Sequence, residues 1–410
     1  MSTSIIKRTV IDDITRFIST RDIIVIHGAR QVGKTSILTF LQEYLIANGE
    51  LTLYIDLEDS RFVSLLDKGV DEFITYLAEQ GFSQKNLNES SKKLFVMIDE
   101  IQYLANPSSF LKLLADHHPY LKVIVSGSSS FEMKSKFKDS LVGRTINFEI
   151  YPLSFQEFLT FKGVAFTPAD HFTKKKSAEL QRLFTEFALY GGYPKIVLTQ
   201  EIDIKEKYLQ QIIDTYVRKD IRDLADIKDI NKFNRLLEIL SSQSSNLLNV
   251  SELCATCSLS RETVERYLFL LEQTYILRLV RPFARNLRSE LTKTPKIFFY
   301  DTGLLQMLWL KQLQKEIIGA VFETSIFTEL IKRHGTDNVF YWRTQDKQEI
   351  DFILRSGKDV TPLETKMSFP RAVPAAILSF NEKYKPKDYW VISLDGNVSE
   401  SRFIHPWQLP

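Results

Sequence analysis

The segment that decides the fold is HGARQVGKTS, residues 27–36, which carries the spacing G-x-x-x-x-G-K-[ST]. It follows the β-branched run DIIVIHG (22–28) and precedes the helical stretch SILTFLQEYLIANG (36–49). Strand, loop and helix in that order are the context in which such a loop binds phosphates. The glycines let backbone N–H groups turn inward, and the helix N-terminus adds its positive dipole end. The segment therefore predicts a phosphate cradle made of Gly28, Ala29, Arg30, Gln31, Val32, Gly33, Lys34 and Thr35.

Within this cradle, Lys34 is expected to bridge the β- and γ-phosphates, and the Thr35 hydroxyl to coordinate Mg²⁺. A second motif, LFVMIDEIQ (94–102), is an apolar run that ends in an acidic pair. We expect Asp99 to hold Mg²⁺ through water and Glu100 to polarise the attacking water. The strand-like segment TLYIDLED lies between the two motifs. This order favours an ATP-hydrolysing class of protein over a simple metabolic kinase.

The next apolar run, LKVIVSGSSS (121–130), ends in serines. Ser126 or Ser128 is a candidate to hydrogen-bond the γ-phosphate or the lytic water. Ordinary turn serines explain the same pattern equally well, so both interpretations stay open.

Bulk properties place limits on the other functions of the chain. Its 410 residues predict two to four domains, and a net charge of +2 leaves any basic patch local. No run approaches 18 uninterrupted apolar residues, so we expect no membrane span. The two cysteines, Cys254 and Cys257, fit a reducing interior, and we expect a cytoplasmic protein. Their Cys-x-x-Cys spacing lacks a second ligand pair, so core packing is expected rather than zinc.

Several motifs together resemble prokaryotic AAA+-type ATPases related to the STAND signalling group. They are HGARQVGKTS, LFVMIDEIQ, VIVSGSSS, GRTINFEIYPLSFQEF and YGGYPK, followed by YVRKDIRDL, FFYDTGLL and EIDFIL, which look like the C-terminal domain of unknown function that accompanies this ATPase. The resemblance implies ATP and Mg²⁺ as cofactors and a homo-oligomer, with a hexameric ring as one form. It also aligns Arg144 with a position that often reaches the γ-phosphate of a neighbouring subunit. Arg144 is therefore a candidate arginine finger, against the alternative of a surface arginine packed on the next strand.

The middle of the chain divides into two predicted segments. Residues 151–230 are expected to be a helical lid and connector, and residues 231–300 a winged helix. In SRETVERYLFLLEQT, one apolar stripe is buried at helical spacing, and Arg261, Thr263 and Arg266 lie on the opposite face. With Arg285 in the following hairpin, these residues are the candidate DNA contacts. Residues 261–296 hold eight basic and four acidic residues, a local charge of +4. A protein–protein role for the winged helix remains the alternative.

The last predicted domain, residues 301–410, resembles the PD-(D/E)xK nuclease-like superfamily. A helix carries Glu323, and two strands in EIDFILRSGKDVTPLETK carry Asp351 and Glu-x-Lys. The resemblance implies that Glu323, Asp351 and Glu364 bind Mg²⁺ and that Lys366 stabilises developing charge. Gathered carboxylates without a metal would repel one another, which favours a bound ion. A DNA-binding domain without cleavage is the alternative.

The sequence thus predicts an α/β multidomain protein: a P-loop AAA+-like ATPase core (1–150), the lid, the winged helix and the nuclease-like domain. The leading hypothesis is an oligomeric ATP-driven motor that acts on DNA, with branched or broken duplexes as candidate substrates. The competing hypothesis is a STAND-like switch in which ATP binding changes conformation and the C-terminal modules contact proteins.

Overall fold

A computed structural model describes residues 5–90, 92–127, 141, 143–169, 171–221, 227, 229–284, 294–396 and 401–410. It divides into two compact units, Met1–Tyr151 and Pro152–Pro410. The segments predicted as lid, winged helix and nuclease-like domain therefore share the second unit. Ser128 and Arg285 lie outside the described residues.

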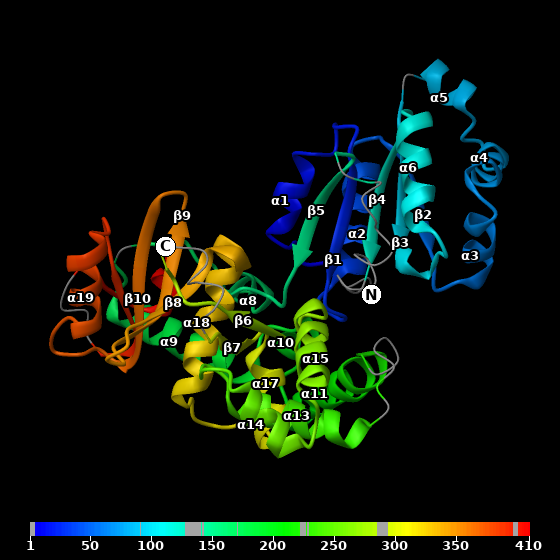
Figure 1. Ribbon diagram of the computed structural model, residues 1–410. Coiled ribbons are helices and arrows are strands. Elements are labelled where there is room, and N and C mark those ends of the chain that lie inside the picture. The colour runs from blue at the N-terminus through cyan, green and yellow to red at the C-terminus, as the bar shows by residue number, and fades with distance from the viewer. Residues whose placement is uncertain are drawn as a thin grey trace. The chain divides into compact units, whose positions relative to one another are not determined.

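The first unit is built on a five-stranded parallel sheet with the order β2-β3-β4-β1-β5 (Figure 1). The strand after the second motif, β4, is inserted between the strands that carry the two motifs. Buried β-branched and aliphatic side chains on both faces explain the nearly continuous apolar runs of the inner strands. The strands are β1 (Ile23–Gly28), β2 (Leu51–Asp56), β3 (Leu94–Asp99), β4 (Leu121–Gly127) and β5 (Thr145–Ile150).

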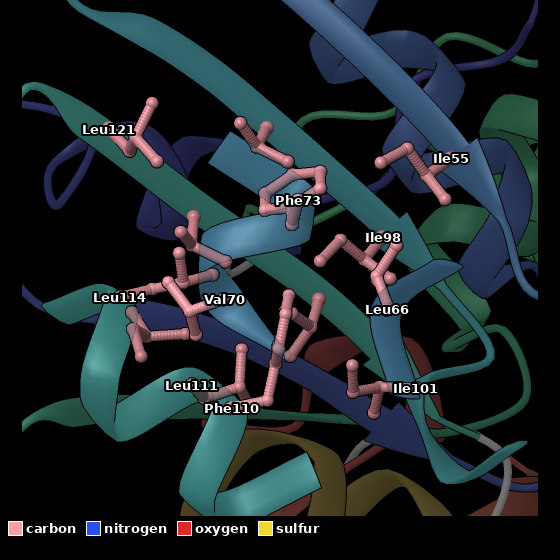
Figure 2. Close-up of a cluster of buried hydrophobic side chains, with 14 of the residues drawn as sticks. Ile55, Leu66, Val70, Phe73, Ile98, Ile101, Phe110, Leu111, Leu114 and Leu121 are labelled. Atoms are coloured by element: carbon pink, nitrogen blue, oxygen red, sulfur yellow. The ribbon is translucent and has the colours of Figure 1, made fainter. Parts of the chain in front are cut away.

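Helices cover both faces of this sheet. The helix α2 (Lys34–Ala47) follows the phosphate-loop motif and buries Ile37, Leu38 and Leu41. A separate cluster joins alternate strand residues such as Ile55 and Ile98 to the other helices (Figure 2). Alternation along a strand sends neighbouring side chains to opposite faces, so each strand supplies both layers. The cluster draws on α3 (Ser60–Asp67), α4 (Val70–Glu79), α5 (Gln84–Ser90) and α6 (Pro107–His117).

The second unit begins with a group of helices. The N-terminus of α8 carries a capping box, in which Ser154 and Glu157 each satisfy the other's backbone N–H. Helix α11 is followed directly by the segment Ile213–Asp220, which has π-helical hydrogen bonding. The helices are α8 (Phe155–Phe161), α9 (Lys174–Tyr190), α10 (Pro194–Leu198) and α11 (Ile202–Ile212).

Three helices and an antiparallel strand pair follow along the chain. They are α13 (Ile230–Ser242), α14 (Val250–Cys257), α15 (Arg261–Gln273), β6 (Leu277–Val280) and β7 (Lys296–Phe299). Ser260 accepts a hydrogen bond from the Thr263 backbone N–H at 3.2 Å and so caps α15, as its sequence indicates. Both cysteines are free; Cys257 is buried in α14 and Cys254 is half-buried. Burial raises the pKa of the Cys257 thiol.

A second five-stranded sheet, with the order β12-β11-β10-β9-β8, closes the chain. Strands β8 to β10 are antiparallel, whereas β11 runs parallel to both β10 and β12. Helix α18 lies beside this sheet in Figure 1 and contacts β8, β9 and β10. The elements are α17 (Thr302–Leu310), α18 (Gly319–His334), β8 (Val339–Arg343), β9 (Glu349–Ser356), β10 (Asp359–Ser368), α19 (Ala375–Tyr384), β11 (Trp390–Asp395) and β12 (Phe403–Ile404).

A buried carboxylate ties distant parts of the second unit together. Asp301 is 2 % exposed, and it accepts backbone hydrogen bonds from Leu304 at 2.9 Å and Gly192 at 2.7 Å. It thereby caps α17 and binds the Gly-Gly-Tyr-Pro motif, 109 residues earlier in the chain. Burial raises the pKa of Asp301, and the backbone donors together with Lys332 oppose that shift. The motif is thus a docking point for a carboxylate.

Gly191 provides the space for this contact, which yields a stability prediction. Its φ is +80°, and a Cβ there would lie less than 3.0 Å from the Asp301 carboxylate. Gly163 also has positive φ, +70°, but a Cβ there meets nothing within 4 Å. We expect Gly191→Ala to lower the free energy of unfolding by about 2–3 kcal/mol more than Gly163→Ala, because both variants carry backbone strain and only the first adds a clash. Urea unfolding of the two variants measures this, and equal losses would contradict it.

Candidate nucleotide site and C-terminal carboxylate cluster

The phosphate-loop motif forms a tight turn between β1 and α2. Gly33 precedes α2 with φ +99°, and Gln31 also has positive φ, +61°. A Cβ on Gly28 would overlap the Ile150 carbonyl of β5, so this position requires glycine. The buried Arg8 guanidinium donates hydrogen bonds to the carbonyls of Val32 at 2.8 Å and Tyr151 at 3.0 Å. Arg8 thus fastens the loop to the end of β5, a role that no sequence motif indicated.

Lys34 is folded back onto its own loop. Its ammonium is buried and donates to the carbonyl oxygens of Ala29 at 2.8 Å and Gly28 at 3.3 Å. Burial lowers the pKa of Lys34 to about 8, against the opposing effect of Glu100 and Asp99. A polyphosphate in the cradle would offer this amine anionic oxygens in place of neutral carbonyls, which fits the predicted ligand.

Asp99 is the centre of a hydrogen-bond network at the ends of three strands. Its Oδ2 accepts from the Thr35 hydroxyl at 2.7 Å and from the Tyr54 hydroxyl at 2.8 Å. Its Oδ1 accepts from the hydroxyl of Ser126, which lies on the intervening strand β4. Burial first, and then Asp99, raise the pKa of Tyr54, so its hydroxyl stays a donor. The sequence did not single out Tyr54, because a tyrosine on an edge strand gives no signal of its own.

Glu100 is held in an unusual backbone conformation beside Asp99. Its φ is +56°, a region that side chains other than glycine seldom adopt. Its N–H donates to Asp99 Oδ1 at 3.1 Å and Ser126 Oγ at 3.2 Å, and the Gln102 amide donates to its carboxylate. Gln102 belongs to the same motif, but the sequence alone assigned it no role. Its spacing of two from Glu100 was the signal that could have identified it.

Thr35, Asp99 and Ser126 therefore present oxygens at the mouth of the phosphate loop. Hydroxyl and carboxylate oxygens are the ligands that Mg²⁺ prefers beside a nucleotide phosphate. These residues fit a nucleotide with its magnesium: Thr35 and Asp99 would hold the ion, and Glu100 lies next to them. In the structure the Ser126 hydroxyl contacts Asp99 and the backbone N–H of Glu100. A contact of Ser126 with the γ-phosphate or the lytic water stays a prediction.

Arg144 lies at the end of the sheet where the strands begin, opposite the end that carries the phosphate loop. It precedes β5, whose first residue pairs with Ile23 at the start of β1, whereas the phosphate loop follows the end of β1. Six residues of strand span about 20 Å. The Arg144 guanidinium makes a two-pronged ion pair with Asp116, at 2.7 and 3.2 Å. Arg144 therefore cannot reach the phosphate loop of its own chain without rearrangement of the sheet.

The predicted DNA-contacting face of α15 is less cationic than its sequence indicates. Arg261 and Arg266 are exposed, as expected, but Arg261 pairs with Glu265 at 2.8 Å. The Thr263 hydroxyl bonds to the capping Ser260 at 2.8 Å. Of the other basic residues in segment 261–296, Arg278 pairs with Asp337 and Lys296 is buried, so neither adds a free positive charge to this face. Arg281 is exposed, and the remaining three, Arg285, Arg288 and Lys293, lie outside the described residues.

Four acidic side chains gather in the second unit and form what we call the carboxylate cluster: Glu323, Glu349, Asp351 and Glu364. Glu323 comes from α18, the next two from β9 and the last from β10. Asp351 Oδ2 accepts from the backbone N–H of Thr365 at 2.8 Å and from its hydroxyl at 2.7 Å. Lys366 pairs with Glu364 at 2.6 Å. The neighbouring strands thus bring Asp351 and Glu364 close, as their spacing predicts.

A lysine from outside the predicted domain lies in this cluster. The Lys296 ammonium, on β7, is 2.6 Å from Glu349, 3.2 Å from Glu323 and 4.0 Å from Asp351. Burial alone would lower the pKa of Lys296, but Glu323, Asp351 and Glu349 together raise it well above the ordinary value. Burial and then Asp351 raise the pKa of Glu323 and of Glu364.

The metal set predicted from Glu323, Asp351 and Glu364 is not assembled as such. Across the described part of the chain, no three His, Cys, Asp or Glu side chains are arranged to hold a metal ion. A physical reason is Lys296, whose ammonium is 3.2 Å from Glu323 and 4.0 Å from Asp351, where it would compete with a divalent ion. Glu364 has no such contact with Lys296, and its Oε2 is buried without a hydrogen-bond partner among the described residues. Along the sequence Lys296 belongs to the basic segment 261–296, but in the structure it is a buried counter-ion.

The parallel sheet, the glycine-bounded loop before α2 and the acidic pair at the end of β3 define a P-loop domain of the AAA type. Residues 20–159 match an AAA domain. Residues 181–316 and 318–409 match two domains of unknown function, DUF8612 and DUF4143. The chain thus carries an ATPase-like AAA domain followed by two domains without an assigned role.

Curated relatives match most of the chain, and one of them matches all of it. An uncharacterised protein of Haemophilus influenzae is 27% identical over 429 residues, with 100% of both chains covered. An uncharacterised protein of Methanocaldococcus jannaschii is 28% identical over 342 residues, which cover 80% of this chain and 71% of that one. The first of these likenesses extends over all three segments that match domain models.

Solved structures give a much weaker likeness. AMPPCP-bound DnaA from Aquifex aeolicus is 15% identical and covers 64% of this chain and 86% of its own, with a TM-score of 0.28. PCH-2 of C. elegans is 15% identical, covers 63% of each chain and has a TM-score of 0.27. TM-scores this low do not establish a common overall fold.

No helix among the described residues combines the length and apolar character needed to cross a bilayer.

Proposed function

We propose that the first unit binds and hydrolyses ATP with Mg²⁺. The observation that carries this proposal is the 2.7 Å hydrogen bond from Thr35 to Asp99, which closes the mouth of the phosphate loop beside Glu100. A bound magnesium ion would neutralise charge on the phosphate oxygens. No motif for recognising guanine occurs in the sequence, which favours ATP.

The protein groups have distinct parts in this reaction. With nucleotide bound, Lys34 would leave the loop carbonyls and pair with the β- and γ-phosphate oxygens, and Thr35 and Asp99 would hold the metal. Glu100 orients the attacking water and accepts its proton. Gln102 acts through Glu100, because its amide fixes the carboxylate direction, and is therefore a positioning residue. Tyr54 and Ser126 fix Asp99 in the same way.

Two substitutions separate binding from turnover. We expect Lys34→Ala to weaken ATP binding by at least about tenfold, because a charged contact to phosphate contributes roughly 1.5–3 kcal/mol. We expect Glu100→Gln to bind ATP within about threefold of the parent but to lose at least about a hundredfold in turnover, since general-base catalysis contributes that much. Calorimetry and steady-state phosphate release measure the two effects. A Lys34→Ala protein that binds and hydrolyses ATP like the parent contradicts the proposal.

We propose further that Arg144 acts on the nucleotide of a neighbouring copy, so that hydrolysis depends on assembly. Its place at the edge opposite the phosphate loop supports action in trans, and its pair with Asp116 supports a stored position in the single chain. In this account Arg144 exchanges Asp116 for phosphate oxygens when copies assemble.

For Arg144→Ala we predict a fall in turnover of at least about tenfold with unchanged nucleotide affinity, because an arginine finger stabilises only the transition state. Asp116→Ala is the matched control, since it removes the same ion pair but keeps the arginine. Phosphate release is measured together with the oligomeric state by light scattering. If Arg144→Ala assembles and hydrolyses ATP at the parent rate, Arg144 is a surface residue.

For the second unit we propose a lid, a winged helix and a nuclease-like domain, with DNA contacts on the exposed face of α15. The support is the exposure of Arg261 and Arg266 beside a capped helix N-terminus. Arg285, the fourth candidate, extends the proposal into the following segment. ATP hydrolysis in a homo-oligomer would then drive movement on DNA. No cleavage step is proposed for the C-terminal domain, because the carboxylate cluster holds a lysine.

The DNA proposal predicts a salt effect that can be measured. We expect duplex affinity to fall steeply with salt, and the joint replacement of Arg261 and Arg266 by alanine to reduce the slope of log K against log salt by about two, since each arginine releases about one counter-ion. Lys311→Ala is the control, because Lys311 is a cation of the same unit on another helix, paired with Glu238. A slope that the double variant leaves unchanged removes α15 as the DNA face.

A nucleotide-dependent switch is the second candidate, and one observation favours it. The Lys34 ammonium already has partners in the carbonyls of its own loop. ATP binding would have to exchange these contacts for phosphate oxygens, which suits a change of conformation. Steady-state hydrolysis with forked, junction and single-stranded DNA separates the two: a motor is stimulated several-fold by one of them, whereas a switch turns over slowly with all.

A further inference from the structure

The carboxylate cluster of the second unit contains its own cation. Lys296 is 2 % exposed, and its ammonium lies within 4.0 Å of three carboxylates that come from α18 and β9. Its stem passes the Tyr341 ring, with the ammonium 5.7 Å from the ring centre. These contacts and its low exposure place Lys296 in the interior of the second unit.

The backbone holds Lys296 in this place. It pairs with Val280 in the β6–β7 ladder and forms a further bridge to Leu247. The hydrogen bonds of its neighbours, from Leu248 N to the Pro295 carbonyl at 2.8 Å and from Ile297 N to the Asn246 carbonyl at 3.1 Å, fix the strand on the other side. The backbone of Lys296 is therefore fixed by strand pairing on both sides.

The remaining charges of the cluster are also paired. Glu349 receives Arg343 on its second oxygen at 2.6 Å, and Glu364 receives Lys366 at 2.6 Å. If all four carboxyl groups are counted as ionised, they face three cations, which leaves a single negative charge. A divalent ion added to this set would produce an excess of positive charge. Without Lys296, in contrast, the excess charge is two negative units, which one divalent ion balances.

The distances between the Lys296 ammonium and the carboxylate oxygens also argue against a metal ion in the same place. Mg²⁺ requires oxygen ligands at 2.0–2.1 Å in a near-octahedral arrangement. The ammonium lies 2.6 Å from Glu349 and 3.2 Å from Glu323, which is hydrogen-bonding distance to the oxygens that would form such a shell. Its protons are donors and cannot coordinate a metal. Lysine and metal therefore exclude each other at this site.

We propose that Lys296 is the permanent cation of the carboxylate cluster, so that this nuclease-like domain binds no divalent metal, cleaves no phosphodiester and instead uses the cluster to lock β7 to β9. Replacement of Lys296 uncovers a divalent metal site in Glu323, Glu349 and Asp351. The inference does not depend on ATP hydrolysis, because the site and the readout are both in the second unit.

Mn²⁺ binding to the full chain tests the proposal. All proteins carry Asp99→Asn, which removes the metal ligand of the phosphate loop, and no nucleotide is present. Electron paramagnetic resonance counts bound Mn²⁺. We expect no stoichiometric Mn²⁺ below about 1 mM in this parent, one Mn²⁺ per chain bound at least about tenfold more tightly when Lys296→Met is added, and loss of that ion when Asp351→Asn is added as well. Lys387→Met, which breaks an exposed ion pair with Asp359, is the matched control.

Thermal unfolding gives an independent readout. Removal of one partner from a buried ion pair is costly, so Lys296→Met should lower the melting temperature by roughly 6–15 °C, and Mn²⁺ should restore much of that loss. The control Lys387→Met should change by less than about 2 °C, as exposed pairs contribute little.

Two results overturn the proposal. One is a parent protein that binds Mn²⁺ stoichiometrically and loses it on Asp351→Asn, a comparison that needs no variant of Lys296. The other is a folded Lys296→Met protein that gains no metal. If Lys296→Met does not fold, the comparison of the parent with Asp351→Asn alone decides the question.

Discussion

The hydrogen bond from Thr35 to Asp99 is the interaction on which the first unit depends. It links the first residues of α2 to the end of β3, although β4 separates β3 from the strand that precedes the phosphate loop. The inserted strand supplies Ser126, which completes the bond set of Asp99 and fixes the backbone of Glu100. One carboxylate therefore joins the loop, the helix and three strand ends, and the proposed nucleotide site rests on this arrangement.

Much of this unit could be predicted from the sequence, because its information is local. The spacing from Gly28 to Thr35 and the apolar run before Asp99 each fix a strand end and a side-chain type. Tyr54, Arg8 and Gln102 could not be assigned in this way. Their roles arise from which strand ends lie side by side and from how a side chain reaches across the sheet, and neither is encoded in a short motif.

In the second unit, local sequence predicts much less of the arrangement of side chains. Periodicity and turn residues indicated helices and strands in this unit, but its buried charges join segments that the sequence treats as separate. Asp301 binds Gly192 across 109 positions, and Glu329 of α18 accepts the Phe155 backbone N–H at 3.0 Å. Lys296 was counted with a surface patch because charge patterning along the chain gives sign and number but not burial. One compact unit results, in which carboxylates accept hydrogen bonds from distant backbone groups and the buried Lys296 pairs with carboxylates of other elements.

The central claim is that Thr35 and Asp99 hold a magnesium ion against a nucleotide. Calorimetry with a slowly hydrolysed ATP analogue, with and without Mg²⁺, tests it most directly in the parent and in Thr35→Val, which keeps the shape and removes the hydroxyl. We predict that Mg²⁺ tightens binding to the parent by at least about tenfold and to Thr35→Val by less than about twofold, because the ion loses a ligand. An equal gain from Mg²⁺ in both proteins would contradict the account.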